Sequence, residues 1–334
     1  MARFVPRRSL GAGVRALCTS SVRLDVPKTH FGFRTVDEGA KEGLVGGVFS
    51  SVASSYDMMN DAMSLGIHRL WKNRFVELLD PRSGIQCLDV AGGTGDIALR
   101  ILDHARTAHF DRETQVTVLD INPKMLVEGQ KRIKQSMYWN TPQIKFQLGN
   151  AEALDQVLPV PERKNPVVST ARNPILPPLV SEPIPSASVD LYTIAFGIRN
   201  CTHIDRVIAE AYRVLKPGGI FAVLEFGKVS VPLLSTMYRS YSFNVIPHLG
   251  QLLAGDRDSY QYLIESIERF PSQPEFARMV ADAGFILPGT PESELMGLPR
   301  LGSACSRSHG AWEDLSLGIA SIWLGIKPFT QKAA

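Results

Sequence analysis

The residues whose types and spacing most clearly indicate chemistry lie at 88–97, Leu-Asp-Val-Ala-Gly-Gly-Thr-Gly-Asp-Ile. A short apolar run containing an acid turns through three glycines within four residues and then begins a helical pattern. In a parallel α/β sheet, such a loop lies at the carboxyl end of the first strand, where these sheets bind ligands. Glycine suits the loop because a Cβ would keep the backbone away from a cofactor. The Gly92-Gly93-Thr94-Gly95 spacing is not the Gly-x-Gly-x-x-Gly of dinucleotide sites, so it favours S-adenosylmethionine over NAD, FAD or a structural turn.

Two more polar residues end predicted strands. Asp120 ends the strand predicted at 115–120, where a carboxylate can accept hydrogen bonds from both hydroxyls of a ribose. It follows Gly95 by 25 residues, more than the usual separation of about 20, and the polar loop at 109–114 accounts for the difference. A solvated acid at a strand end is the alternative. Asn150, after the strand predicted at 144–149, is placed to hydrogen-bond an adenine.

A polar pair, Arg199 and Asn200, follows the apolar run at 189–196, which is typical of a strand buried on both faces. We expect this pair to lie beside the glycine loop.

A further candidate segment at 46–79 has a helical pattern and holds Tyr56, Asn60, His68 and Arg69 among apolar residues. It is either an amphipathic helix with capped ends or a lid over a polar aromatic ligand.

The elements that must position these residues alternate between strand and helix. Four such alternations predict an α/β fold with a parallel, doubly wound sheet and right-handed crossovers. The expected elements are strands at 85–90, 115–120, 144–149, 189–196, 220–226 and 317–326 and helices at 96–108, 203–215 and 272–284, with a turn at 216–219. The aromatic, apolar segment at 231–264 is core, the wall of a lipophilic pocket or a membrane contact.

The domain organisation follows from the segments that lack such patterns. Residues 25–44 are expected to be a linker to one domain at 45–330. Two irregular insertions interrupt that domain. The first, at 155–186, holds eight prolines and therefore cannot form a helix or a central strand. The second, at 287–311, is rich in Gly, Ser and Pro.

The charge distribution and the cysteine spacing exclude some classes of function. The formal net charge is +3, and residues 1–24 hold five arginines and no acid, so the rest carries 3 − 5 = −2 and is not basic enough to indicate nucleic-acid binding. Those first residues resemble a mitochondrial transit peptide, with a disordered basic tail as the alternative. The four cysteines lack metal-ligand spacing, so neither a metal site nor a disulfide framework is predicted. No run of 18 apolar residues occurs.

With these elements placed, the chain resembles the C-methyltransferases of ubiquinone and menaquinone synthesis. The resemblance is carried by Tyr-Asp-Met-Met-Asn-Asp at 56–61, His-Arg-Leu-Trp-Lys at 68–72, the glycine loop, the strand and loop at 193–200, Arg-Val-Leu-Lys-Pro-Gly-Gly at 213–219, and 260–271. It covers roughly 30–154, 188–286 and 313–328. Similar proteins have short turns where this chain has the insertions at 155–186 and 287–311.

The resemblance implies a class I S-adenosylmethionine-dependent methyltransferase with a seven-stranded, mostly parallel sheet whose last strand is antiparallel and whose faces both carry helices. Carried over by position, the cofactor-binding residues are Gly92, Thr94, Gly95, Asp120, Asn150 and Ala151. The implied reaction is C-methylation of a polyprenylated methoxy-benzoquinol, leaving S-adenosylhomocysteine. It also implies peripheral contact with the matrix face of the mitochondrial inner membrane, within a complex of coenzyme Q enzymes.

A ring carbon becomes nucleophilic once a neighbouring ring hydroxyl, whose pKa is near 10, loses its proton. We expect the Arg199 guanidinium to stabilise that oxyanion, Asn200 to orient the second oxygen, and Tyr56 or a water to take the proton. Three alternatives remain open at this point. They are the same chemistry on demethylmenaquinol or a small soluble phenol, a non-catalytic lipid-binding or scaffold subunit, and an oxidoreductase.

Overall fold

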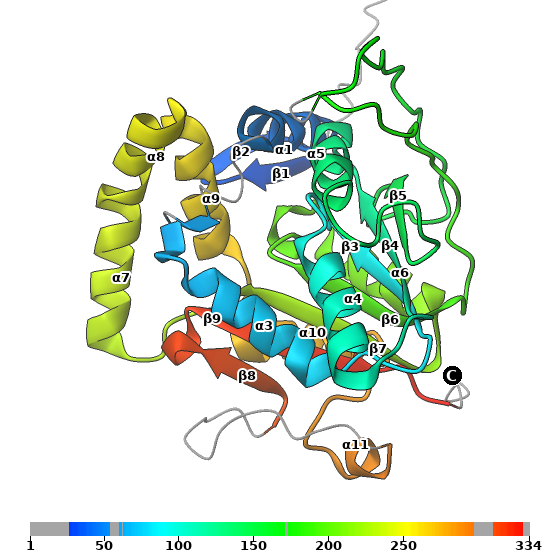
Figure 1. Ribbon diagram of the computed structural model, residues 1–334. Coiled ribbons are helices and arrows are strands. Elements are labelled where there is room, and N and C mark those ends of the chain that lie inside the picture. Colours follow the sequence, from blue (N-terminus) through cyan, green and yellow to red (C-terminus); the bar gives the residue numbers. More distant parts are fainter. Residues whose placement is uncertain (1–26, 54–59, 62, 171–172, 297–309, 330–334) are drawn as a thin grey trace, which may run out of the picture.

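The computed structural model describes residues 27–53, 60–61, 63–170, 173–296 and 310–329. A seven-stranded sheet with the order β5-β4-β3-β6-β7-β9-β8 forms the centre (Figure 1). Its strands are β3 (Gln86–Val90), β4 (Gln115–Asp120), β5 (Ile144–Leu148), β6 (Val189–Ala195), β7 (Leu215–Phe226), β8 (Trp312–Leu315) and β9 (Ala320–Ile326). The first five of these pair in parallel, and β9 is antiparallel to β7 and β8. The predicted fold class is therefore confirmed, including the antiparallel last strand.

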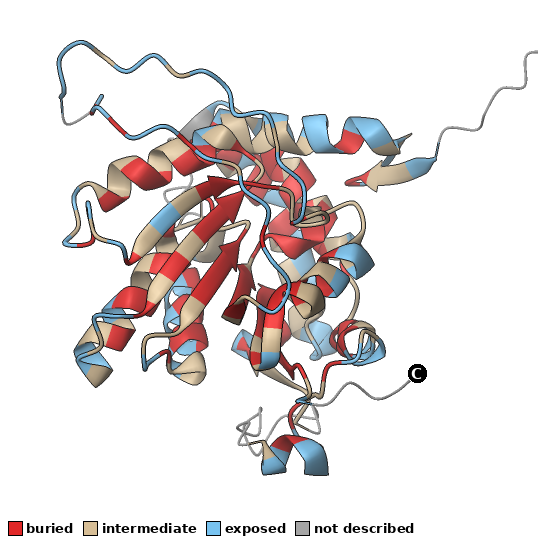
Figure 2. Ribbon diagram, turned by 90° about the vertical axis from the view of Figure 1, so that its right-hand side faces the viewer, coloured by how far each residue is buried: buried red, intermediate tan, exposed pale blue. Residues whose placement is uncertain are grey.

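Helices cover both faces of this sheet. The described helices are α1 (Glu38–Val52), α3 (Ile67–Leu79), α4 (Asp96–His109), α5 (Pro123–Ile133), α6 (Ile204–Val214), α7 (Pro232–Asn244), α8 (Ile246–Ala254), α9 (Arg257–Arg269), α10 (Gln273–Asp282) and α11 (Pro291–Leu295), and those that pack on the sheet include α3, α4 and α5 on one face and α6 and α10 on the other. Successive β3 residues face opposite layers. Cys87 packs with Ile101 and Leu126 of α4 and α5, whereas Leu88 packs in the same cluster as Val207 of α6. The strands are accordingly the most buried part of the molecule (Figure 2).

The carboxyl end of the glycine-loop strand lies where the sheet changes winding direction. From β3 the chain builds outward through β4 to β5, and it then returns to place β6 on the other side of β3. Such a switch point leaves a crevice between neighbouring loops, which is where open α/β sheets bind their ligands. Among the described helices, none combines the length and the apolar character that crossing a bilayer requires.

The predicted linker at 25–44 is wrong for residues 28–44. They form a hairpin of β1 (Lys28–Phe31) and β2 (Arg34–Asp37), followed by the first half of α1. Phe31 stacks on Tyr262 of α9, with ring centroids 4.2 Å apart, and belongs to a small core separate from the sheet. Partners more than 200 residues away order this segment, so its local composition could not reveal it.

The remaining differences are at strand ends. The turn predicted at 216–219 lies inside β7, where Gly218 has a φ of +82° and the pairing with β6 shifts register. The last strand begins at Ala320 rather than at 317, because Leu317 adopts a left-handed φ of 61°. The separate strand β8 was not predicted, and the aromatic segment at 231–264 contains α7, α8 and most of α9.

The two insertions differ in what they contain. The described part of 155–186 has no helix or strand, as expected, but it follows the sheet edge. The Leu148 N–H donates to the Val180 carbonyl at 2.8 Å, and Leu176 and Leu179 are buried. The insertion thus covers the otherwise unpaired edge of β5. The insertion at 287–311 includes α11, and its residues 297–309 lie outside the described part, as do 1–26.

Candidate active site

A cavity of about 530 Å³, here called the main cavity, opens at the carboxyl ends of β3, β4 and β6. Its size is within the range of ligand sites for molecules of cofactor size. The glycine loop, the Asp120 loop and the loop after β5 form its walls, and α1 contributes further residues. Of the predicted cofactor residues, the cavity is lined by Gly92, Thr94, Asp120, Asn150 and Ala151. The structure therefore brings together side chains from three different strand ends.

The glycine loop needs its glycines for close packing and for left-handed backbone. A Cβ on Gly92 would lie 2.8 Å from both the Asp89 carboxylate and a Val118 methyl group. Gly93 and Gly95 have positive φ values of 49° and 74°. Gly95, however, is the residue before α4 and does not line the main cavity, so its part in the loop is to begin the helix.

Asp120 is held by the backbone on both of its oxygens. One oxygen accepts from the Gly93 N–H at 3.0 Å and the other from the Asn122 N–H at 2.8 Å. Burial raises the pKa of Asp120 to about 6, and the backbone hydrogen bonds offset only part of that effect. Each oxygen retains a lone pair. The carboxylate is thus fixed in position and can still accept from two ligand hydroxyls.

Asp89, next to the loop, was not predicted as a site residue. One of its oxygens accepts from Thr193 at 2.8 Å, while the other is buried and has no partner among the described groups. Burial raises the pKa of Asp89 to about 7. An acid inside an apolar strand is the sequence feature that could have identified it. A buried, unpaired acceptor in the wall of the main cavity fits a ligand with N–H donors, such as the ammonium of S-adenosylmethionine.

Asp96, the first residue of α4, pairs with a lysine from α3. The Lys72 Nζ lies 2.9 Å from the Asp96 carboxylate, and both residues line the main cavity. Burial would raise the pKa of Asp96, but the charges of Lys72 and Arg100 outweigh it and lower the pKa to about 2. An ionised Asp96 therefore fastens α3 to the start of α4.

The loop after β5 is ordered by its own polar groups. The Asn150 Oδ1 accepts from the Glu152 N–H at 2.9 Å, which leaves the Asn150 amide N–H groups to face a ligand. Glu152 in turn accepts from the Thr202 N–H and bonds the His203 Nδ1 at 2.8 Å. The side-chain oxygen of Asn150 is therefore engaged inside its own loop. Only its donor side can serve an adenine.

Helix α1 covers the main cavity and is fastened to its rim. Lys41 is almost fully buried and donates to the Cys201 carbonyl at 2.9 Å. Glu38 pairs with His203, and the Asn122 side chain donates to the Gly46 carbonyl at 3.2 Å. These contacts make α1 a lid, whereas the sequence favoured a linker over its first half.

Arg199 lies in the short helical turn η2 (Ile198–Asn200) after β6 and is buried. Its Nη1 donates to the Glu225 carboxylate at 2.7 Å and to the Phe196 carbonyl at 2.6 Å. Its guanidinium carbon lies 5.1 Å from the centre of the Phe226 ring, and its Nε has no partner in the described part of the chain. Glu225, an acid inside the apolar strand β7, was missed as a site residue.

Arg199 faces a second cavity of about 170 Å³, here called the side pocket. Its walls are mainly apolar and aromatic, and they come from α3, α7 and α9. Phe196 lines both the side pocket and the main cavity and so separates them. Asn200 lines the main cavity instead, with its Oδ1 accepting from the Tyr262 hydroxyl at 3.1 Å. Tyr56, the predicted proton acceptor, lies outside the described residues.

This arrangement fits a two-substrate reaction. The main cavity presents acceptors for ribose hydroxyls and an ammonium, beside backbone that a Cβ would obstruct. The side pocket presents a cation among aromatic rings. A planar, apolar molecule with an acidic hydroxyl suits the side pocket, because Arg199 can stabilise its anion.

Comparison with known proteins gives a consistent result. Residues 37–158 and 180–289 match the family model described as the ubiE/COQ5 methyltransferase family, and the unmatched stretch between them lies within the first insertion. A Schizosaccharomyces pombe protein named 2-methoxy-6-polyprenyl-1,4-benzoquinol methylase, mitochondrial, is 49% identical over 94% of this chain and 89% of its own length. A Paracoccus denitrificans protein named ubiquinone/menaquinone biosynthesis C-methyltransferase UbiE is 45% identical over 91% of this chain and 98% of its own. A Dictyostelium discoideum protein with the same name as the first is 46% identical over 91% and 87%.

Proposed function

The chain belongs to the ubiE/COQ5 methyltransferase family, and from this membership we propose how its residues perform the reaction. It is an S-adenosylmethionine-dependent C-methyltransferase of ubiquinone biosynthesis that acts on a polyprenylated methoxy-benzoquinol, the activity for which its relatives are named. When bound, S-adenosylmethionine supplies a methyl group activated by its sulfonium and leaves as S-adenosylhomocysteine.

The proposed cofactor site is the main cavity. Asp120 accepts from the two ribose hydroxyls with the lone pairs that its backbone donors leave free. Gly92 and Thr94 lie along the methionine part, Gly95 begins α4 behind them, and Asn150 and Ala151 flank the adenine. The unpaired oxygen of Asp89 supports the same orientation, because it offers an acceptor to the ammonium.

The proposed acceptor site is the side pocket. Arg199 stabilises the oxyanion of the ring, since guanidinium stays protonated and cannot itself serve as a base. Glu225 and the Phe196 carbonyl hold its Nη1 and so fix the direction of the charge. Asn200 lines the main cavity and not the side pocket, so it meets the second ring oxygen only where the ring extends past Phe196. Tyr56 or a water remains the proton acceptor expected from the sequence alone.

The chain is a mitochondrial enzyme, as its relatives are named. We place it on the matrix face of the inner membrane, in contact with other enzymes of the pathway and with residues 1–24 as a transit peptide. Exposed apolar side chains on and next to the helices that line the side pocket support the membrane contact. They include Leu65 and Leu70 around α3 and Leu233 and Met237 on α7. A polyprenyl tail would leave the pocket among these side chains.

One observation carries the proposed roles: a single aromatic side chain, Phe196, separates a polar cavity from an apolar pocket that holds a buried cation. The proposed function is tested by measuring methyl transfer from labelled S-adenosylmethionine, catalysed by the full chain. The acceptors are a short-chain 2-methoxy-6-prenyl benzoquinol, the oxidised quinone and demethylmenaquinol. We expect label in the first quinol, because the quinone has no hydroxyl proton to lose. Tight cofactor binding without transfer would favour a scaffold role. Flotation with cardiolipin-containing vesicles tests the membrane contact separately.

A further inference from the structure

The side pocket contains a basic group that the proposed roles do not use. His68, the second residue of α3, lines the pocket and is 6% exposed. Its Nε2 lies 2.8 Å from the Asp61 Oδ1, whereas its Nδ1 is buried and has no partner among the described residues. Buried polar atoms are nearly always paired, so an unpaired one in a pocket wall indicates a ligand that supplies the missing hydrogen bond.

The Asp61 carboxylate determines the protonation of the ring. Arg69 donates to both Asp61 oxygens, at 2.8 and 2.6 Å. The hydrogen bonds of Arg69 and His68 lower the pKa of Asp61, so Asp61 is an anion. An anionic partner requires that the His68 Nε2 carry the hydrogen. The neutral ring then has its lone pair on Nδ1, the nitrogen without a partner.

We propose that His68, in place of Tyr56 or a water, is the proton acceptor of the reaction and that Asp61 is its positioning residue. This inference rests on the proposed function. The Nδ1 atom takes the proton of the ring hydroxyl, and Asp61 stabilises the resulting imidazolium, while Arg199 stabilises the oxyanion. The pair thereby has the division of roles seen in His–Asp pairs of hydrolases.

The proton and electron count closes with these groups. The ring carbon donates an electron pair to the methyl carbon of S-adenosylmethionine and forms a C–C bond with it. The bond between that methyl carbon and sulfur breaks, and its electron pair stays on sulfur. The ring hydrogen then departs to water as a proton, and the oxygen recovers its proton from the His68 imidazolium. The overall release is one proton. No oxidant or reductant is needed.

The charges around His68 keep it neutral at neutral pH. Burial lowers its pKa, and the nearby Lys72 cation lowers it further. The Asp61 and Asp96 anions oppose this shift without reversing it. Arg199 lines the same pocket and brings a further positive charge to it. His68 is therefore a base over the working pH range, with its protonation confined to pH values below the ordinary histidine value.

The test compares His68→Gln with the wild-type chain in the benzoquinol assay across pH. Gln can keep the hydrogen bond to Asp61 but cannot accept a proton. We expect turnover to fall about 10²-fold or more. The wild-type rate should be flat above its acidic limb, whereas the variant rate should rise about tenfold per pH unit as hydroxide replaces the base. Asp61→Asn should lower turnover less, and His248→Gln, on the exposed part of α8, should change nothing.

Cofactor affinity shows whether His68→Gln loses turnover because it lacks the base or because it is misfolded. His68 does not line the main cavity, so His68→Gln should bind S-adenosylmethionine as the wild type does in calorimetry. A variant with wild-type turnover, or with a pH profile parallel to the wild type, would overturn the role of His68. Absence of transfer by the wild type itself would overturn the proposed function and this role together.

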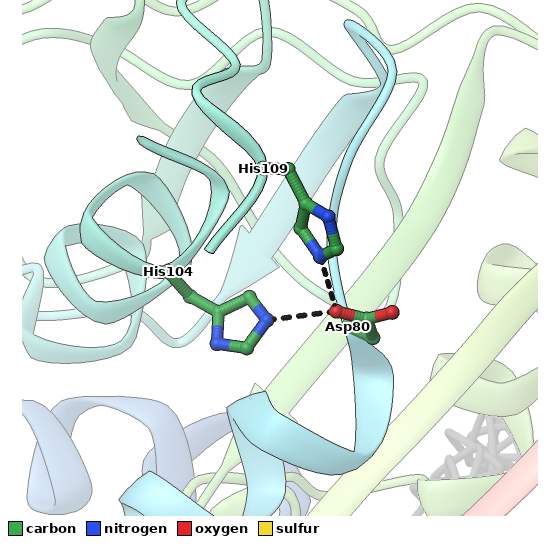
Figure 3. Close-up of side chains that lie close together, drawn as sticks. All are labelled: Asp80, His104 and His109. Atoms are coloured by element: carbon green, nitrogen blue, oxygen red, sulfur yellow. Dashed lines mark hydrogen bonds and ion pairs between the residues drawn. The ribbon is translucent and has the colours of Figure 1, made fainter. Parts of the chain in front are cut away.

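A different cluster lies at the opposite end of the α3–α4 pair. Asp80 follows α3, and His104 and His109 lie in the last turns of α4 (Figure 3). Both imidazole rings turn their Nε2 atoms to the same Asp80 oxygen, at 2.9 and 2.5 Å. The three ligand atoms lie within 4.8 Å of one another. Arg82 pairs with the other Asp80 oxygen and leaves this one to the histidines.

We infer that Asp80, His104 and His109 form a site for a divalent metal of the zinc class, which takes imidazole and carboxylate ligands. Two imidazoles and one carboxylate supply three ligands, with water as the fourth. The side chains of all three are partly exposed, so a hydrated ion can enter. A metal there would connect the end of α3 to the end of α4, whose first residue, Asp96, lies at the main cavity. The cysteines play no part in it.

The test is Co²⁺ titration of the untagged full chain, followed by visible absorption and by the melting temperature with Zn²⁺. We expect one equivalent with the d–d bands of tetrahedral Co²⁺ and a rise in melting temperature that EDTA reverses. His104→Gln should lose both, and His248→Gln should keep both. Equal binding by His104→Gln, no d–d band, or a thiolate charge-transfer band would each overturn the site.

Discussion

The main cavity and the side pocket meet at Phe196, but the chain builds them in different ways. The main cavity comes from loops that directly follow β3, β4, β5 and β6, and parallel strands bring such loops together by topology. The side pocket comes from α3, α7, α9 and residues around them, and only the packing of these helices creates it. The difference teaches that the proposed cofactor site follows from strand order, whereas the proposed acceptor site depends on tertiary contacts.

The largest expected effect is on the side pocket. Arg199→Ala should lower turnover about 10²–10³-fold, because the developing oxyanion loses its cation. It also leaves the fully buried Glu225 unpaired, which should lower the free energy of unfolding by about 3–5 kcal/mol. Arg199→Ala/Glu225→Gln should recover much of the stability but not the turnover. Loss of cofactor affinity in proportion to turnover would show that the two sites are not separate.

Removal of the wall between the sites should have the next largest effect. Phe196→Ala should lower turnover about 10²-fold, since the acceptor ring is no longer held against the methyl group. Calorimetry should find S-adenosylmethionine binding little changed, because the polar contacts of the main cavity stay. Phe196→Leu keeps most of the wall and is the control. Wild-type turnover in Phe196→Ala would contradict the wall's role.

On the main-cavity side, Asp120→Asn should weaken S-adenosylmethionine binding about tenfold or more, the value of charged hydrogen bonds. Burial raises the Asp120 pKa to about 6, so wild-type affinity should fall as pH drops below about 6 and the carboxylate is protonated. The variant should lack this dependence. Asp111→Asn, at a residue that does not line the main cavity, is the control. Identical pH profiles would exclude Asp120 from ribose binding.

The lid gives a smaller effect. Lys41→Met removes the hydrogen bond to the Cys201 carbonyl and preserves the volume of a side chain that is 1% exposed. The dissociation rate of S-adenosylmethionine in stopped-flow should rise several-fold, because α1 loses one of its fastenings. Lys28→Met, on the exposed start of β1, should leave the rate unchanged. An unaltered rate in Lys41→Met would mean that α1 does not retain the cofactor.

The smallest effect lies away from both cavities. The hydrogen bonds of His104 and His109 lower the pKa of Asp80. A lowered folded-state pKa stabilises the fold above the unfolded value of about 3.9, and this stability is lost as pH falls through the lowered folded-state pKa. With EDTA present, Asp80→Asn should therefore lower the melting temperature slightly at pH 7, and this difference should shrink as the pH falls through the acidic range. If Asp80→Asn and the wild type had the same melting temperature at pH 7, the cluster would not contribute to the stability of the α3–α4 pair.

Much of the sheet could be predicted because its pattern is local. The strand at Gln115–Asp120 was predicted to the residue, since an apolar run bounded by a polar loop and an Asn-Pro cap defines both ends. The hairpin at 28–37 could not be predicted, because Phe31 is ordered by Tyr262. Asp89 and Glu225 were missed for a related reason: an acid in an apolar strand is visible, but its function depends on what lies beside it.

The sequence by itself determined the fold class, the family, and the positions of the glycine loop and Asp120 at strand ends, because glycine spacing, strand ends and motif identity need no knowledge of distant contacts. Only the tertiary structure decided that Arg199 and Asn200 face opposite sides of Phe196, that α1 is a lid, and that His68 shares a pocket with Arg199. These features depend on segments far apart in the chain. Side chains become buried and find their hydrogen-bond partners only when those segments pack together, so a local pattern of residues cannot predict these contacts.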